Sequence, residues 1–423
     1  MSAPAALPPR VGLYASYALA LLSVTNLVNY LERNAIFALF EPIKRDLQFT
    51  DAHLGWLGSV YVLVFSLASV PAGIASDLGS RRVVLAAGIV LWSVATSLSG
   101  LVEGFGSLLL ARAVVGLGGA MAATAGASMV ADYFPGERRS IAMGVFMAGL
   151  AVGGVLGILI AGQLEHHYGW RVTFFTLGLP GFLIAALTVR LKDPTRPVPA
   201  ERQSAAALRA TARELEGAGR RILGSRTLVA VFVGGALISF GMNGLVGWAP
   251  TFLARERGLS IADATLLLGS YGLIAGTAGT VAGGFVADWL RTRWASGRLL
   301  ATGLGFLLGS PLAVWLLFIR DMTWFVPVFA AAFFFLTWYN GPLTAVIFDV
   351  TPARIATTVV GAFLMFIHLA GDAIAFPLVG FISDQFGLQQ AILLLPIAAL
   401  LGALIVLLGA PSVAKDTERA LAA

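Results

Sequence analysis

Two fully charged side chains, Glu32 and Arg33, stand next to each other inside what otherwise reads as a membrane-spanning helix. The surrounding stretch, 11–40, contains no other Asp, Glu, Lys or Arg. Placing a charge in the middle of a bilayer costs roughly 2.5–3.5 kcal/mol on insertion scales, so such a residue faces a protein interior or a water-filled cavity. The pair therefore marks a candidate functional site.

The two side chains are expected to have separate roles, because neighbours on a helix point about 100° apart. Removal from water favours the protonated form of a carboxyl group, which makes Glu32 a candidate proton-binding switch. The guanidinium fork of Arg33 matches the geometry of phosphate, which makes it a candidate ligand for an anionic head group. The alternative is a structural network of ion pairs with no functional role.

Other polar residues lie within apolar stretches. His368 and Asp372 are four residues apart, hence on one face of a helix, and such a pair can titrate near neutral pH. We expect them to join Glu32 in proton coupling, with backbone capping as the alternative for Asp372. The remaining candidates, expected to contact substrate together with Arg33, are Asn29, Arg112, Asn243, Trp248, Tyr339 and Asn340. The alternative for Arg112 is a side chain that reaches the membrane interface, and the alternative for the last four is ordinary helix packing. The aromatic run Phe333–Phe335 is expected to face lipid or the core.

Composition makes lipid the solvent of this chain. Of its 423 residues 58% are hydrophobic and 12% are charged, whereas soluble domains carry about 25% charged residues. The absence of cysteine excludes disulfides and cysteine-based metal sites, and the four histidines show no metal-ligand spacing. The net charge of +6 resides between apolar stretches, which argues against nucleic acid as a partner. No nucleophile constellation or phosphate loop indicates an enzyme, and no cofactor is expected.

The apolar stretches predict an all-α membrane protein with twelve spans, because a span needs about 20 apolar residues and its backbone must pair internally. The first span is expected to direct insertion without a cleaved signal peptide. Lys and Arg are concentrated in alternate loops, which predicts that both termini are cytoplasmic. The expected spans are 11–40, 52–76, 83–102, 106–132, 140–164, 170–191, 227–254, 261–289, 299–319, 323–349, 356–382 and 388–410.

An internal repeat divides the chain into halves. Gly58-Ser59, Gly73 and Asp77 recur 211 residues later as Gly269-Ser270, Gly284 and Asp288. We therefore predict an N-terminal six-helix half over 1–191, an arginine-rich cytoplasmic linker over 192–226 that is partly an amphipathic surface helix, and a C-terminal half over 227–423. Transporters built from such repeats bind substrate between the halves and rock around it. Basic residues follow both aspartates, so the candidate gating charges are Asp77, Arg81, Arg82, Asp288 and Arg291.

Several motifs resemble a known superfamily. The segment 73–82, with Asp77, Arg81 and Arg82, is similar to the loop between helices 2 and 3 of the major facilitator superfamily, and 112–120 is similar to its fourth-helix motif. Within that superfamily the chain looks like the Spinster family. The stretches that carry this likeness are Asn29-Tyr-Leu-Glu-Arg33, Glu41-Pro-Ile-Lys-Arg-Asp-Leu47, Trp248-Ala-Pro-Thr-Phe-Leu253 and His368-Leu-Ala-Gly-Asp-Ala373.

The resemblance implies a major facilitator fold, an inner gate latched by the charges around Asp77 and Asp288, and export or flipping of lysophospholipids or sphingoid lipids linked to protons. The chain departs from the family pattern at three positions. Glu32 stands where helix 1 usually has aspartate, Gly119 where helix 4 usually has glutamate, and Leu78 where an arginine usually follows the motif aspartate. The missing glutamate bears directly on proton coupling.

Together these features predict an alternating-access transporter of amphipathic lipids, coupled to protons through Glu32 and present as a monomer in the lipid bilayer of the plasma membrane. The alternatives are a proton-coupled symporter of small organic anions, a drug-like exporter, and a receptor that does not transport. The C-terminal half has no basic residue within an expected span, which favours a substrate with one charged end.

Overall fold

The computed structural model describes residues 12–134, 136, 138–193 and 216–422, and throughout these ranges the chain is helical, without strands. The N-terminal half begins with α1, which runs over Leu13–Leu47. The helices that follow are α2 (Asp51–Leu78), α3 (Arg81–Leu98, extended by a 3-10 turn at Ser99–Leu101), α4 (Phe105–Tyr133) and α5 (Arg138–Thr188). Gly169, with φ of 78°, breaks α5 into two successive spans.

The C-terminal half is built in the same way. Its first helices are α7 (Arg226–Arg257), α8 (Ile261–Arg291) and α9 (Gly297–Leu316). One broken span follows as α10 (Met322–Leu336), a 3-10 turn (Thr337–Tyr339) and α11 (Pro342–Asp349), and a second as α12 (Ala356–Ile367), a π-helical turn (His368–Asp372) and α13 (Ala373–Phe386). The chain ends with α14 (Leu388–Leu408), a 3-10 turn (Ala410–Ser412) and α15 (Val413–Leu421).

These helices confirm the predicted all-α membrane architecture. Within the described ranges ten helical stretches are long and apolar enough to cross a membrane, with α5 counted once and α1 not among them. Local signals explain several helix ends. Thr50 and His53 form a capping box at the start of α2, Ser260 caps α8, and Gly258, with φ of 68°, ends α7.

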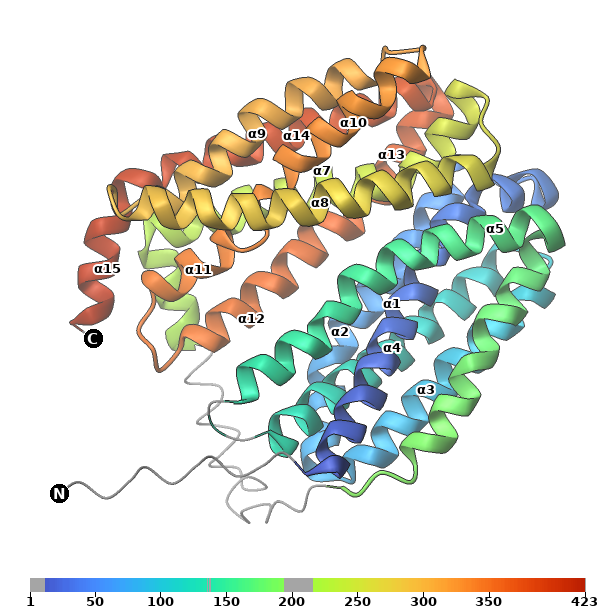
Figure 1. Cartoon of the computed structure of the whole chain (residues 1–423), viewed down its shortest axis with the longest axis horizontal. Helices are drawn as coiled ribbons and strands as arrows, with labels where there is room; N and C mark the ends of the chain where they lie inside the picture. The colour runs from blue at the N-terminus through green and yellow to red at the C-terminus, as the bar shows by residue number, and fades with distance from the viewer. Residues whose placement is uncertain (1–11, 135, 137, 194–215, 423) are drawn as a thin grey trace.

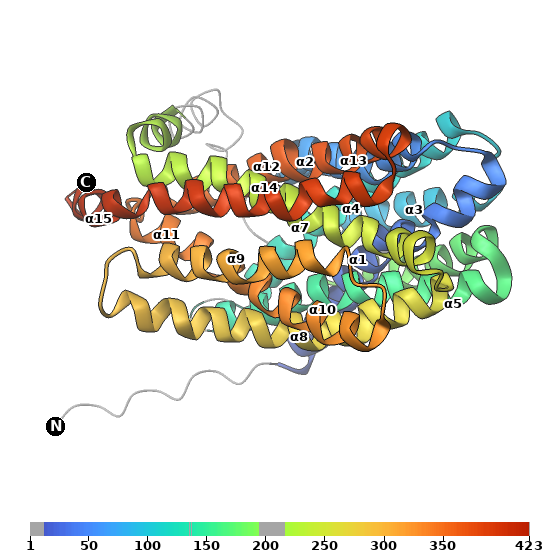
Figure 2. The same ribbon diagram turned by 90° about the horizontal axis from the view of Figure 1, so that it is seen from above.

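The two halves lie side by side and meet at one end of the molecule (Figures 1 and 2). In the N-terminal half α1 packs against α5 and α4 against α2 and α3, while in the C-terminal half α7 packs against α14 and α10 against α8 and α9. Between the halves, α2 contacts α13 and α5 contacts α8. At the end that carries α15 the halves diverge, so we refer to the opposite end as the closed end.

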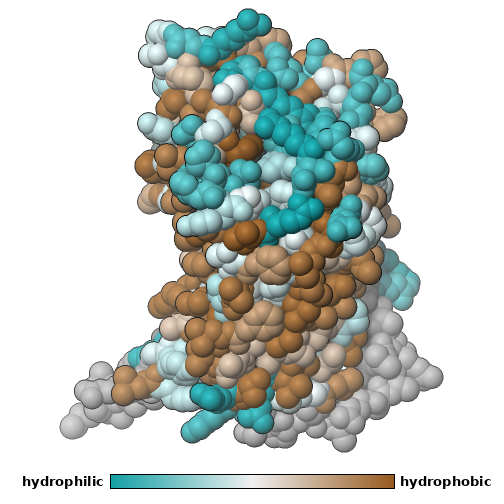
Figure 3. Space-filling view, turned by 90° about the vertical axis from the view of Figure 1, so that its right-hand side faces the viewer, coloured by the Kyte–Doolittle hydropathy of each residue, from teal (hydrophilic) through white to brown (hydrophobic). Residues whose placement is uncertain are grey.

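The surface suits a protein surrounded by lipid. Seen from the closed end, polar residues gather in the upper part of the view, above a largely hydrophobic flank (Figure 3). Large apolar side chains lie exposed on many helices, among them Leu110, Leu183 and Phe285. The predicted domain boundaries stay a prediction, and residues 194–215 of the predicted linker lie outside the described residues. Its described end, helix 216–224, is fastened to the C-terminal half, because Arg221 donates hydrogen bonds to the carbonyls of Val350 and Asp416.

Candidate functional site

A cavity of about 580 Å³ lies between the halves, with walls from α1, α5 and α7 to α10. Most of its lining is apolar. Among the described residues that line it, Arg33 is the one with a permanent charge. Asn34, Asn243, Asn340 and His368 are the polar neighbours that line the same cavity.

Arg33 presents its guanidinium group to this cavity without a partner of opposite charge. The group lies over the rings of Tyr30 and Tyr61, with its central carbon 5.5 and 5.3 Å from their centroids. The side chain makes no ion pair or hydrogen bond within the described part of the chain. Aromatic faces attract a cation but leave its N–H donors unused, so this guanidinium can accept an anion.

Glu32 points away from the cavity into the N-terminal half, where it is 1% exposed. Its carboxyl group lies toward Trp92 and Thr96 of α3 and interacts by charge with Arg112. Neither oxygen has a hydrogen-bond partner of normal geometry in the described ranges. Adjacent residues thus occupy different environments, as the helix geometry predicts. Their separate roles stay a prediction.

Arg112 is also buried in the N-terminal half and does not line the cavity. It donates a hydrogen bond of 3.0 Å to the carbonyl of Arg33 and lies 5.4 Å from the centroid of the Tyr61 ring. Its charge therefore supports the backbone that carries Arg33, and among its charged neighbours are Glu32 and Arg33.

The space beside Gly119 of α4 is occupied by side chains of α1 and α2. A Cβ atom there would lie 2.7 Å from the Tyr61 hydroxyl and 2.9 Å from Nδ2 of Asn29. The Tyr61 hydroxyl in turn donates to Oδ1 of Asn29 at 3.4 Å. The carboxyl group that interacts with Arg112 comes from Glu32 on α1 instead.

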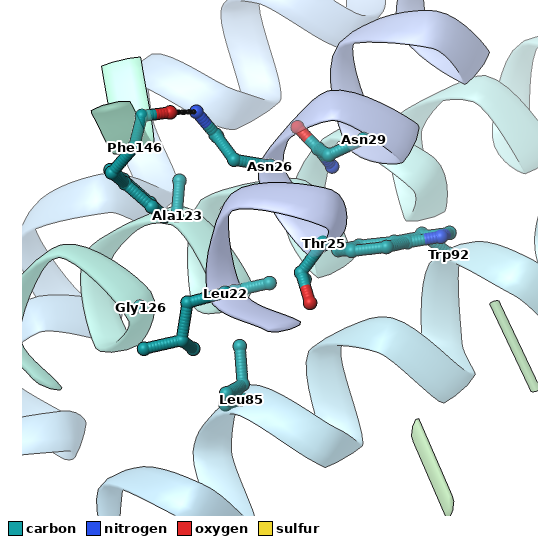
Figure 4. A pocket seen from close by; sticks show the side chains of 10 residues that line it. Leu22, Thr25, Asn26, Asn29, Leu85, Trp92, Ala123, Gly126 and Phe146 are labelled. Atoms are coloured by element: carbon teal, nitrogen blue, oxygen red, sulfur yellow. Dashed lines mark hydrogen bonds between the residues drawn. The ribbon is translucent and has the colours of Figure 1, made fainter. Parts of the chain in front are cut away.

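Asn29 lines a small, mostly apolar space beside this network (Figure 4). The space has a volume of about 10 Å³ and is lined by Thr25, Asn26, Asn29 and Trp92 among others. Asn26 donates to the Phe146 carbonyl at 2.8 Å and thereby links α1 to α5. Asn29 is 4% exposed, so it belongs to the interior of the half and not to the cavity wall.

The C-terminal half contributes a polar cluster around Asp372, which is fully buried. Its carboxylate receives hydrogen bonds from Ser239 and, at 2.9 Å, from Asn243, and lies 2.6 Å from Nδ1 of His368. The predicted pair on one helix face is present, within a π-helical turn, a feature frequent at functional sites. His368 and Asn243 connect this cluster to the cavity.

The remaining substrate candidates divide between the cavity and the interior. Asn340 lines the cavity and donates to Thr280 at 3.2 Å. Tyr339 packs against Phe306 near Asp372, and Trp248 is fully buried against Phe40. The structure thus brings Arg33, Asn243, His368 and Asn340 to one cavity, while Asn29, Arg112, Trp248 and Tyr339 lie behind its wall.

Sequence reasoning missed an aromatic wall. Phe333, expected to face lipid or the core, lines the cavity together with Phe329 and Phe325. Their four-residue spacing, which puts them on one face of α10, is the signal that could have found them.

The predicted gating charges at the diverging end pair within each half. Arg81 forms ion pairs with Asp77, at 3.3 Å, and with Asp132, while Arg82 is exposed. In the C-terminal half Asp288 pairs with Arg298 at 3.6 Å and Arg291 with Asp349 at 3.1 Å. Asp288 and Arg291 are close in sequence, but Asp288 takes its partner from α9 and Arg291 takes its partner from α11. The latch role stays a prediction.

The closed end is held by charges that the sequence did not reveal. Asp384 of α13 accepts hydrogen bonds from the backbone N–H groups of Asp51 and Ala52, at 2.8 and 2.9 Å, and so caps α2 across the two halves. Arg255 of α7 reaches Glu41 at 2.5 Å and Asp51 at 2.7 Å. We call Glu41, Asp51, Arg255 and Asp384 the closed-end cluster.

Replacing Asp384 by alanine is expected to loosen the closed end. The loss of a helix-capping carboxylate costs about 1 kcal/mol, up to about 2, and here that cost falls on the conformation in which the halves touch. Because the chain has no native cysteine, spin labels can be placed at the exposed positions 167 and 385. We expect the ratio of molecules with a longer label-to-label distance to molecules with the closed-end distance to rise about five- to thirtyfold.

The matched control is Asp321→Ala, because Asp321 caps α10 through the Thr323 N–H at 2.8 Å within one half. Its distance distribution should equal that of the unsubstituted protein. An unchanged distribution for Asp384→Ala would show that the cross-half cap does not hold this end.

Comparison with known proteins agrees with this architecture. Residues 22–373 match the model of the Major Facilitator Superfamily. A sphingosine-1-phosphate transporter, SPNS2, from Xenopus tropicalis is 27% identical over 95% of this chain and 83% of its own length. A probable galactarate/D-glucarate transporter from Escherichia coli strain K12 is 26% identical over 83% of each chain.

Among solved structures, a bacterial homolog of the human lysosomal transporter Spinster, crystallised in an inward-facing and occupied conformation, superposes with a TM-score of 0.83. It is 22% identical, and the match covers 96% of this chain and 98% of the other. At that identity the likeness concerns the fold. The family match agrees with the cavity between two pseudo-symmetric halves, and the protein is a multi-pass membrane transporter and not an enzyme. The chain belongs to the Major Facilitator Superfamily and is similar to its Spinster transporters.

Proposed function

We propose that the protein transports single-chain amphipathic lipids, of the lysophospholipid or sphingoid type, by alternating access. The observation that carries the proposal is the guanidinium of Arg33, which has no ion-pair partner among the described residues and lies beside a largely apolar cavity. One charged end of a substrate would pair with Arg33 and its apolar remainder would occupy the rest of the cavity. Guanidinium forks bind phosphate in this way.

The cavity wall also supports lateral entry from the bilayer. Leu150 of α5 and Leu273 and Val281 of α8 line the cavity, yet they are 43%, 37% and 54% exposed. Our proposal therefore includes a lateral opening between α5 and α8. A lipid could leave or enter the membrane there without crossing water. The protein would act as a monomer in the plasma membrane, with both termini cytoplasmic.

Proton coupling through Glu32 is part of the proposal. Glu32 is buried next to the residue that touches substrate, and its carboxyl group interacts with Arg112, which holds the carbonyl of Arg33. Protonation of Glu32 would change the charge balance of this network. His368 and Asp372 would form a second proton-binding pair that faces the cavity from the other half.

A small organic anion is the alternative substrate, favoured by similarity to the galactarate/D-glucarate transporter. A sugar diacid carries two carboxylates, and burying them without cationic partners against a hydrophobic wall is unfavourable. The described cavity wall offers one cation, Arg33, and a row of phenylalanines, so we favour the lipid.

Uptake into proteoliposomes separates the two substrates. We expect labelled lysophospholipid to cross the membrane faster with the protein than without it, and to respond to an imposed pH gradient, while labelled D-glucarate does not move. Transport of glucarate with no effect on any lysophospholipid would overturn the proposal in favour of the organic anion.

A further inference from the structure

Beyond Arg33 the cavity continues inside the C-terminal half toward the closed end, along a row of stacked aromatic rings. The rings of Phe325 and Phe329 are 6.4 Å apart and inclined by 9°, and those of Phe329 and Phe333 are 5.7 Å apart and inclined by 20°. Phe333 follows Phe325 by eight residues on α10, which gives a wall roughly 12 Å long. This wall suits an extended alkyl chain better than a compact polar solute.

The row ends blindly. Phe252, Leu317 and Phe325 line the far end of the cavity and are only 4%, 3% and 2% exposed. Polar groups close the end from outside. The guanidinium of Arg257 lies 4.8 Å from the Phe252 ring centroid and donates to the Leu317 carbonyl at 2.6 Å. Gln389 donates to the same carbonyl at 3.0 Å. An alkyl chain in this space would therefore meet a fixed stop.

Gly272 of α8 lies directly opposite the rings. A Cβ atom at this position would lie 3.7 Å from Phe329 and 3.9 Å from Phe333, in ordinary contact. The neighbouring glycines of the same wall differ, because a Cβ at Gly269 or Gly276 would come within 2.8 Å of Leu159 or Phe333. A side chain at position 272 would thus extend from a contact with the rings into the cavity that they line, whereas a side chain at 269 or 276 would displace packed neighbours.

We propose that this blind space, the tail slot formed by Phe252, Gly272, Leu317, Phe325, Phe329 and Phe333, holds the alkyl chain of the substrate and selects it by length. The inference rests on the proposed function, in which Arg33 binds the charged head. With the head fixed at Arg33, each further methylene enters the slot until the terminal methyl reaches the stop. Burial of one methylene strengthens binding about fourfold, and this gain ends at the stop.

The test measures dissociation constants of the full-length protein for a homologous series of n-alkyl phosphates, from octyl to octadecyl. For the unsubstituted protein we expect affinity to rise about fourfold per methylene and then to level off. Gly272→Leu fills the slot, so affinity should level off at shorter chains while octyl phosphate binds as before. Phe325→Ala removes the stop, so the rise should continue to longer chains.

The matched control is Gly284→Leu, which adds the same side chain to the same helix where a Cβ meets nothing within 4 Å. If affinity levels off at the same chain length in both leucine variants, in Phe325→Ala and in the unsubstituted protein, the tail slot is overturned. Binding of the phosphate head at Arg33 would still stand in that case. If no alkyl phosphate binds the unsubstituted protein, both the tail slot and the proposed function are overturned. Opposite shifts in Gly272→Leu and Phe325→Ala would establish the slot.

Discussion

Arg33→Ala is expected to weaken binding of a single-chain alkyl phosphate about thirtyfold and to abolish its transport at low concentration. A hydrogen bond to a charged group contributes roughly 1.5–3 kcal/mol, of which 2 kcal/mol corresponds to about a thirtyfold change in affinity. The effect is large because the described cavity wall contains no other permanent cation that could replace this guanidinium. Arg33→Lys keeps the charge but loses the planar fork, so an intermediate loss is expected.

The measurement compares an alkyl phosphate with an alkyl glucoside of the same chain length. Arg33→Ala should weaken binding of the alkyl phosphate but not of the alkyl glucoside, because the glucoside has no charge that pairs with Arg33. The control Arg320→Ala removes an exposed arginine outside the cavity and should alter neither ligand. Equal affinity for the phosphate in Arg33→Ala and the unsubstituted protein would remove Arg33 from head-group recognition.

The membrane architecture could be predicted from the sequence because lipid imposes a strong and local constraint. Each span must be apolar over its own length and must pair its backbone within itself, so no knowledge of distant contacts is needed. Gly169 shows the limit of this reasoning. The gap between the expected fifth and sixth spans predicts a loop over 165–169. In the structure the helix continues to Gly169, and this single residue of positive φ makes the turn.

The charged pair at Glu32 and Arg33 could also be found in the sequence, since a charge among apolar residues stands out. The partners of charged residues elsewhere in the chain could not be found in this way. Asp384 caps α2 across 333 positions of sequence, and Asp288 takes Arg298 as its partner although Arg291 is nearer in sequence. Such contacts depend on how the helices cross, which hydropathy does not encode.

The cavity illustrates the same limit. Most of its lining residues are apolar and look like any other residue of a membrane span, so composition cannot separate a wall that faces substrate from one that faces lipid. Phe333 and Phe334 are neighbours of one type, yet Phe333 lines the cavity while the Phe334 ring packs against Phe335 and Trp338. Only the crossing of α8 and α10 distinguishes them.

Glu32→Gln is expected to uncouple transport from the pH gradient while leaving downhill transport intact. A gradient of one pH unit stores about 1.4 kcal/mol per proton, enough for about a tenfold concentration difference of a substrate moved with one proton. Glutamine preserves the shape of the side chain but cannot bind and release a proton. With the membrane potential collapsed, the unsubstituted protein should sustain this tenfold difference, and Glu32→Gln should bring the ratio to one.

If Glu32 does not bind the coupling proton, the proton must bind at another titratable group. Position 119 of α4 is a glycine and supplies no proton-binding group, and a Cβ there would already meet Tyr61 and Asn29. The other proton-binding candidate is the His368 and Asp372 pair across the cavity. Glu32→Asp retains a titratable group and should keep a measurable coupling, which controls for the loss of the side chain. If Glu32→Gln still accumulates substrate tenfold while His368→Gln does not, the coupling proton binds in the C-terminal half, and Glu32 is a structural counter-charge for Arg112.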